Sequence, residues 1–146
     1  MDTTSRFRFA LLRCARLLGD EMNAVLIEHG LNYSLWQSLV IIKMNGQCTA
    51  LDIAQELRIS KPAVTKRLNT LIEMNFIESQ PMTDKRQKLL QLSEMGEQQF
   101  QQCCGKIDVL EAELLQDFNK DELKRAHAFV LEFMHSLQAR KELQHD

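Results

Sequence analysis

The chain has 146 residues, of which 45% are hydrophobic and 26% are charged, the size and composition of a folded protein with its own core. Glycine and proline are scarce, which favours a mainly helical protein and excludes low-complexity sequence. The net charge of −2 excludes a chain that is basic throughout, so total charge does not indicate nucleic-acid binding. No apolar run approaches the ~20 residues of a spanning helix. We therefore expect a cytoplasmic protein with no membrane partner, whose four cysteines are free thiols.

Apolar residues at helical spacing predict long helices at both ends of the chain. The first runs from Arg6 to about Glu28, the fifth from Ser93 to about Phe118, and a sixth follows Asn119. Each carries an apolar stripe that has no place in a small central core. We expect these stripes to be buried against one another or against a second subunit.

The second and third helices are short and close together in the sequence. Ser34 and Gln37 have the spacing of a capping box, so the second helix is predicted to begin near Ser34. Thr49 and Asp52 open the third helix, whose inward-facing residues are expected to include Leu51. Only about four residues separate the third helix from the next, which is the short connection of a helix-turn-helix.

The fourth helix is predicted from Lys61 to about Met74. Ser60 is a suitable N-cap, and Pro62 fits the first turn because its missing N–H would have no helical partner there. The buried stripe is expected to include Ile72. A polar helix face is most often simply solvated, but the position in a helix-turn-helix favours contact with DNA. The opposite face carries short or cationic side chains suited to base edges and phosphates: Lys61, Thr65, Lys66 and Asn69.

Two short strands are predicted next, at residues 76–80 and 88–92, with a polar loop between them. The cations of this loop would lie on or over an adjacent minor groove, and Asp84 would pair with a neighbouring cation and fix the loop. Residues 58–88 carry seven positive and three negative side chains, a net +4, which leaves −6 for the rest of the chain. The predicted fold class is mainly α with a small β-hairpin: a winged helix-turn-helix core plus terminal dimerisation helices.

Several motifs in this central stretch match a known family. They are Leu31 with Ser34 and Gln37 at the start of the second helix, residues 51–57 in the third, residues 64–68 in the fourth, Asp84-Lys85-Arg86 in the loop, and Leu92-Ser93 followed by Gly96. In these motifs, and along nearly its whole length, the chain resembles the MarR family of bacterial transcription regulators. Asn75 stands where that family usually has glycine and is the next best residue for a left-handed helix end.

The resemblance implies a homodimer whose terminal helices interlock and which binds a pseudo-palindromic operator in double-stranded DNA. It places Arg86 in the minor groove with Asp84 orienting it, and it implies repression that a small aromatic or phenolic ligand relieves. It divides one compact chain into an N-terminal dimerisation helix (1–30), a winged helix-turn-helix domain (31–96) and C-terminal dimerisation helices (97–146). The predicted DNA-binding residues are Ser60, Lys61, Pro62, Thr65, Lys66, Arg67, Asn69, Asp84, Lys85, Arg86 and Lys88.

Three further residues invite a functional interpretation. In the resemblance Trp36 falls near the ligand crevice and could stack on an aromatic effector, although we favour a core aromatic. Cys14 lies in the helix through which some relatives sense oxidants, but it falls on the apolar stripe, where packing is the default. Oxidant sensing through Cys14 is thus an alternative to ligand sensing. Cys48, in the loop before the third helix, is expected to be the most exposed cysteine.

Other classes of protein fit the sequence less well. It contains no glycine-rich phosphate loop, nucleophile elbow or metal motif, and its histidines form no ligand run, so we expect no enzyme, cofactor or metal site. A dimerisation or adaptor protein that does not bind DNA is the remaining alternative. Such a protein would not need the polar face of the fourth helix together with Arg86 on the loop.

Overall fold

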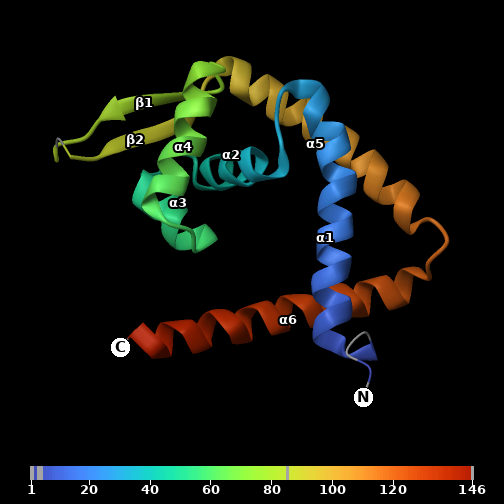
Figure 1. Cartoon of the computed structure of the whole chain (residues 1–146). Helices are drawn as coiled ribbons and strands as arrows, with labels where there is room; N and C mark the ends of the chain where they lie inside the picture. The colour runs from blue at the N-terminus through green and yellow to red at the C-terminus, as the bar shows by residue number, and fades with distance from the viewer. Residues whose placement is uncertain (1, 3–4, 85, 146) are drawn as a thin grey trace. The chain divides into compact units, whose positions relative to one another are not determined.

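Figure 1 shows the computed structural model, which describes residues 2, 5–84 and 86–145 of the chain. It divides into two compact units, residues 1–110 and residues 111–146. The boundary falls inside helix α5 (Glu94–Leu115). The described residues form helices and one two-stranded antiparallel sheet, so the predicted class, mainly α with a small β-hairpin, is confirmed.

The first unit begins with the long helix α1, and the end of this helix is where the sequence places it. A short 3-10 turn, η2, continues the helix, and Gly30 then adopts a left-handed conformation with φ 73° and stops it. The described elements of this unit before α5 are, in chain order, α1 (Phe7–Leu26), η2 (Ile27–His29), α2 (Tyr33–Asn45), α3 (Ala50–Leu57), α4 (Lys61–Glu73), β1 (Ile77–Pro81) and β2 (Lys88–Leu92).

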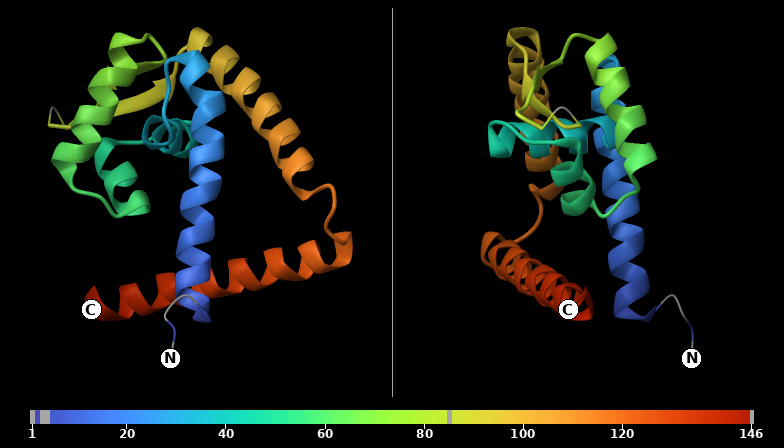
Figure 2. Two further views of the ribbon diagram at one scale, coloured as in Figure 1. Left: turned by 45° about the vertical axis from the view of Figure 1, so that its right-hand side comes forward. Right: turned by 90° about the vertical axis from the view of Figure 1, so that its left-hand side faces the viewer.

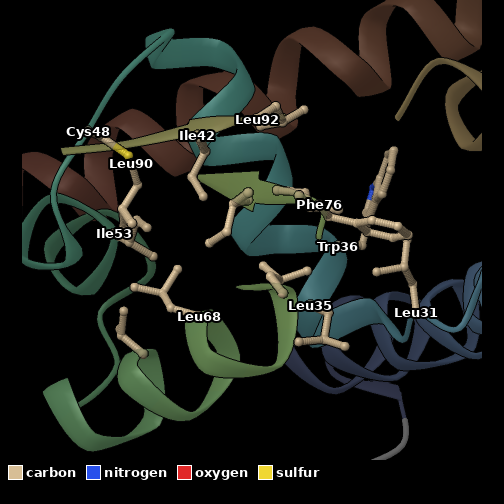
Figure 3. Close-up of a cluster of buried hydrophobic side chains, with 14 of the residues drawn as sticks. Leu31, Leu35, Trp36, Ile42, Cys48, Ile53, Leu68, Phe76, Leu90 and Leu92 are labelled. Atoms are coloured by element: carbon tan, nitrogen blue, oxygen red, sulfur yellow. The ribbon is translucent and has the colours of Figure 1, made fainter. Parts of the chain in front are cut away.

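Helix α2 is the centre of the first unit, because it packs against α1, α3, α4 and β2. In Figure 3, Leu35, Trp36 and Ile42 of α2 point into one cluster with Leu68 of α4 and with Phe76. Burial of each large apolar side chain contributes about 1.5–3 kcal/mol, so this cluster fixes α4 and the hairpin against α2. Figure 2 shows the hairpin beside α4 from two sides.

The helices of the central stretch begin at side-chain caps, one of which differs from the prediction. Asn32 caps α2, since its Oδ1 accepts from the N–H of Leu35 at 2.8 Å, so the predicted cap at Ser34 is wrong by two residues. Asn32 is preferred because its backbone is extended, the conformation that an N-cap requires. The capping box of Thr49 and Asp52 in α3 is confirmed, as is the Ser60 cap of α4.

The hairpin pairs β1 with β2 in antiparallel register, with Ile77 opposite Leu92. A third segment joins it through two backbone hydrogen bonds between Cys48 and Leu90, of 3.1 and 2.7 Å. Cys48 is therefore buried at 3% exposure, and the prediction that it is the most exposed cysteine is wrong. A loop residue drawn into a sheet in this way cannot be recognised from local sequence, because its partner lies 42 positions away.

The second unit consists of the end of α5 and helix α6 (Lys120–His145). The side chain of Asn119 accepts from the N–H groups of Asp121 and Glu122, at 2.8 and 3.1 Å, and so starts α6 where the sequence predicts. All side chains of α6 up to residue 140 are exposed. Among the described residues, no helix combines the length and apolar character needed to cross a bilayer.

Candidate nucleic-acid interface

One face of α4 carries three of the predicted DNA-contacting residues. Lys61, Thr65 and Asn69 follow one another at intervals of four, so successive turns of the helix place them in one row. All three side chains are exposed. Ser60 sets the start of this row, because its hydroxyl accepts from the N–H of Ala63 at 3.3 Å.

The hairpin loop supplies a second set of polar groups. The Oδ1 atom of Asp84 accepts from the backbone N–H of Arg86 at 3.1 Å, and the Asp84 carbonyl accepts from the N–H of Gln87 at 3.0 Å. Asp84 therefore holds the backbone N–H groups of the loop, and its predicted ion pair with a neighbouring cation stays a prediction. Arg86 and Lys88 are exposed. Lys85, which is also predicted to bind DNA, lies outside the described residues.

Helix α4 and the hairpin meet around a hollow of about 350 Å³. Lys61, Thr65 and Asn69 of α4 line it together with Arg86 and Lys88, so five of the predicted residues come together in one place. Sequence reasoning missed other polar groups there, because no local signal points to them. They are Thr49 at the start of α3, Ser79 of β1 and Gln87 of the loop.

Two apolar residues of this hollow were expected to point into the core. Leu51 and Ile72 are 37% and 41% exposed, so that expectation is wrong for both. Each lines the hollow between the helices and the hairpin. Both positions satisfy the helical apolar pattern, but they lie at the edge of the stripe, where the neighbouring element decides what covers them.

The other predicted residues of α4 do not line the hollow. Pro62 and Lys66 are exposed beside the row of three. Arg67 is partly buried, and its Nη1 donates to the carbonyl oxygen of Ser34, in the first turn of α2, at 3.2 Å.

Trp36 is 6% exposed, and its ring stacks on Phe100 of α5 with centroids 4.9 Å apart and an interplanar angle of 16°. The ammonium of Lys43 lies 5.9 Å from the centroid of Phe100 and contacts Glu97 at 2.5 Å. These contacts tie α2 to α5. Trp36 thus has the packing of a core aromatic, the interpretation that the sequence favours.

The four cysteines are free thiols in different surroundings. Cys14 is exposed, so its expected packing is not found in this chain; only the C-terminal end of α1, around Leu26, packs into the core. Burial, with the charge of Asp52 as a smaller cause, raises the pKa of the Cys48 thiol to about 11. Burial also raises the pKa values of Cys103 and Cys104. These three thiols are therefore poor nucleophiles at neutral pH.

Helices α3 and α4 are short and are joined by a tight turn, and the cations of the following hairpin meet α4 at one hollow. This arrangement defines a winged helix-turn-helix DNA-binding protein. Among the residues that the structure describes, no group of three or more His, Cys, Asp or Glu side chains could hold a metal ion.

Comparison with known proteins identifies the family to which this chain belongs. The sequence model of the MarR family matches residues 31–88. An uncharacterised HTH-type transcriptional regulator of Bacillus subtilis, YwoH, is 33% identical over 116 residues, which cover 80% of this chain and 84% of that protein. The chain therefore belongs to the MarR family of transcriptional regulators, which are generally non-enzymatic DNA-binding proteins.

Solved structures show the same fold. A mutant of MarR from E. coli, complexed with operator DNA, has a TM-score of 0.76 at 20% identity, covering 91% of this chain and 99% of that one. A Staphylococcus aureus MarR in complex with salicylate and kanamycin has a TM-score of 0.82 at 23% identity, covering 92% and 91%.

Proposed function

We propose that this protein is a cytoplasmic repressor that binds a pseudo-palindromic operator as a homodimer and is released by a small aromatic ligand. The hollow between α4 and the hairpin carries the proposal of operator binding, because side chains suited to base edges and to phosphates meet there. Helix α4 would enter the major groove with Lys61, Thr65 and Asn69 toward the bases. Arg86 would enter the adjacent minor groove, where the negative potential attracts a guanidinium.

Selection from a pool of random duplexes tests operator binding. We expect enrichment of sites with two-fold symmetry, whose half-site centres lie about one helical turn apart. Binding of a selected duplex is then measured by fluorescence anisotropy at several salt concentrations. Arg86→Ala with Lys66→Ala should abolish specific binding and leave thermal unfolding near wild type. Lys106→Ala is the control for loss of a cation elsewhere, since the Lys106 ammonium pairs with Glu28 at 3.3 Å, outside the hollow.

If the selection enriches no site, the protein is instead an adaptor that does not bind DNA. If specific binding survives both substitutions, the residues assigned to the interface are wrong.

Exposed apolar side chains on α1 and α6 support the homodimer. On α1, Leu17 and Leu18 of the predicted apolar stripe are 50% and 43% exposed. On α6, Val130, Met134 and Leu137 are exposed in the same way. Monomeric proteins rarely leave such stripes in water, whereas a second copy of the chain would cover them.

The mass in solution, measured by light scattering, tests this. We expect twice the 17.0 kDa of one chain. Val130→Asp with Leu137→Asp should shift the mass toward the monomer, because a carboxylate in an apolar interface is costly. Met44→Asp is a matched control, since Met44 is 77% exposed on α2, and it should leave the dimer intact. A monomeric wild-type protein would contradict the homodimer.

The likeness to the Staphylococcus aureus MarR in complex with salicylate and kanamycin supports an aromatic effector. Titration of salicylate into the operator complex should lower the affinity for DNA, while benzyl alcohol, which lacks the carboxylate, serves as a control. If the effector stacks on Trp36, it changes the surroundings of a ring that now stacks on Phe100, and Trp36 fluorescence should change in step with DNA release. Loss of DNA binding without a fluorescence change would place the effector elsewhere.

Because Cys14 is exposed, oxidant sensing through its thiol is the second candidate for how operator binding is regulated. Under this alternative, peroxide lowers operator affinity in the wild type and not in Cys14→Ser. Under the proposal, peroxide leaves operator affinity unchanged in both proteins.

A further inference from the structure

The first turn of α2 is held from two sides by side chains of other helices. The Oδ1 atom of Asn23, in α1, accepts from the backbone N–H of Tyr33 at 2.9 Å. The Nη1 atom of Arg67, in α4, donates to the carbonyl oxygen of Ser34 at 3.2 Å. Two consecutive residues of α2 therefore form backbone hydrogen bonds to other helices, Tyr33 to α1 and Ser34 to α4.

Arg67 does not share the face of α4 that lines the hollow. Successive residues in an α-helix are rotated by about 100°, and Arg67 is two residues from both Thr65 and Asn69. It therefore lies roughly 160° around the helix axis from each of them, on nearly the opposite face. Lys61, Thr65 and Asn69 line the hollow, whereas Arg67 reaches toward α2 from the opposite side. With α4 docked on DNA through its row of three, the Arg67 guanidinium would point away from the bases.

A second observation shows that the Ser34 carbonyl is committed to this contact. The α-helical pattern directs the N–H of Ser38 to the same carbonyl, which has two lone pairs to offer. The hydroxyl of a helical serine can bond to the carbonyl three or four residues earlier, and for Ser38 the carbonyl four residues earlier is again that of Ser34. Ser38 is fully buried, yet its Oγ has no hydrogen-bond partner among the described residues. The Ser34 carbonyl, whose two lone pairs face the Ser38 N–H and Arg67, thus does not accept from the Ser38 hydroxyl.

We propose that Arg67 is a positioning residue of the DNA-binding site, which fixes the angle of α4 against α2 through the Ser34 carbonyl. Together with Asn23 on the neighbouring residue, it couples α1 to the recognition helix. The inference rests on the proposed operator binding through α4. Both bonds end on the backbone of adjacent residues of α2, so a change in the position of α1 reaches α4 through the Asn23 side chain, the first turn of α2 and the Arg67 side chain.

The test replaces Arg67 with methionine, which keeps much of its length and packing but cannot donate. Operator affinity is measured across a range of salt concentrations, with Lys66→Ala as the reference for a lost phosphate contact. Arg67→Met should weaken binding roughly tenfold and leave the slope of log K against log salt unchanged, since no counterion release is lost. Lys66→Ala should reduce that slope by about 1. Arg67→Lys, which retains a donor, should recover part of the affinity.

A slope reduced by about 1 in Arg67→Met would show that Arg67 contacts phosphate and would overturn the proposal. Unchanged affinity in Arg67→Met would overturn it as well. The coupling to α1 is tested by Asn23→Ala alone and combined with Arg67→Met. We expect the double variant to bind little worse than the weaker single variant, whereas additive losses would overturn the coupling.

A measurement without DNA separates this inference from the proposed function. In the free protein, Arg67→Met should accelerate amide hydrogen exchange in α4 and in the first turn of α2, while α6 exchanges as in the wild type. Unchanged exchange in α4 would overturn the positioning role even if the operator is bound. If the wild type binds no selected duplex, operator binding fails, and faster exchange would then show only that Arg67 fixes α4.

Discussion

Gly96, in the first turn of α5, lies directly against the backbone of Phe76, the residue before β1. A Cβ atom on Gly96 would overlap the Phe76 carbonyl oxygen and would lie 2.8 Å from its carbonyl carbon. The same Phe76 carbonyl accepts from the N–H of Ser93 at 3.0 Å, and the Ser93 hydroxyl accepts from the N–H of Gly96 at 2.9 Å. The Leu-Ser-x-x-Gly exit motif thus has a steric cause, since α5 can begin here only if residue 96 has no side chain.

Gly96→Ala should therefore destabilise the fold by about 2–4 kcal/mol, because the obstacle is backbone and cannot rotate away. Chemical denaturation of the purified protein measures this. Gly105→Ala is the matched control in the same helix, where an added Cβ meets nothing within 4 Å. It should be neutral or stabilising by up to about 1 kcal/mol, the difference in helix propensity. Equal effects of the two substitutions would contradict the steric account.

Arg58 ends α3 in the left-handed backbone conformation, with φ 55°, which residues other than glycine adopt only at a cost in free energy. Arg58→Gly should raise the free energy of unfolding by about 0.5–1 kcal/mol. Arg58→Ala removes the same cation but keeps the strain, so it should give no such gain. A gain of the same size in both variants would assign the effect to charge.

The Cys48 thiol gives a pH dependence with a defined sign. Its pKa is 9.0 in the unfolded chain and about 11 in the fold, so the fold favours the neutral thiol. The contribution of this thiol to the free energy of unfolding is complete below pH 9 and is lost as the pH rises toward 11. The total loss is about 2–3 kcal/mol. Urea unfolding between pH 8 and pH 11 measures it, and Cys48→Ala should flatten the decline. A wild-type decline that Cys48→Ala leaves unaltered would contradict this.

Ser38 is fully buried, and its hydroxyl has no partner among the described residues. Ser38→Ala removes that hydroxyl without adding volume, so it should stabilise the protein by about 1 kcal/mol. The midpoint of chemical unfolding measures the effect. In Arg67→Met the Ser38 hydroxyl gains an acceptor, so the benefit of Ser38→Ala should be smaller there. Destabilisation by Ser38→Ala in the wild type would indicate a partner such as a buried water.

The sequence by itself determined the features that depend on near neighbours in the chain. The caps at Thr49 and Ser60, the left-handed end at Asn75 and the start of α6 after Asn119 each involve residues within a few positions of one another. The row of three on α4 is equally local, because helical spacing alone produces it. The fold class followed from such signals.

Only the tertiary structure decided what each side chain meets across the fold. Cys48 is buried because Leu90 pairs with it, and Leu51 lines the hollow because the hairpin folds toward α3 and α4. Arg67, one of the three cations of α4 that the sequence predicts to bind DNA, is turned to Ser34. The physical reason is common to these cases: a periodic pattern specifies which face of a helix is apolar, but not which element, 30 or more positions away, comes to cover it.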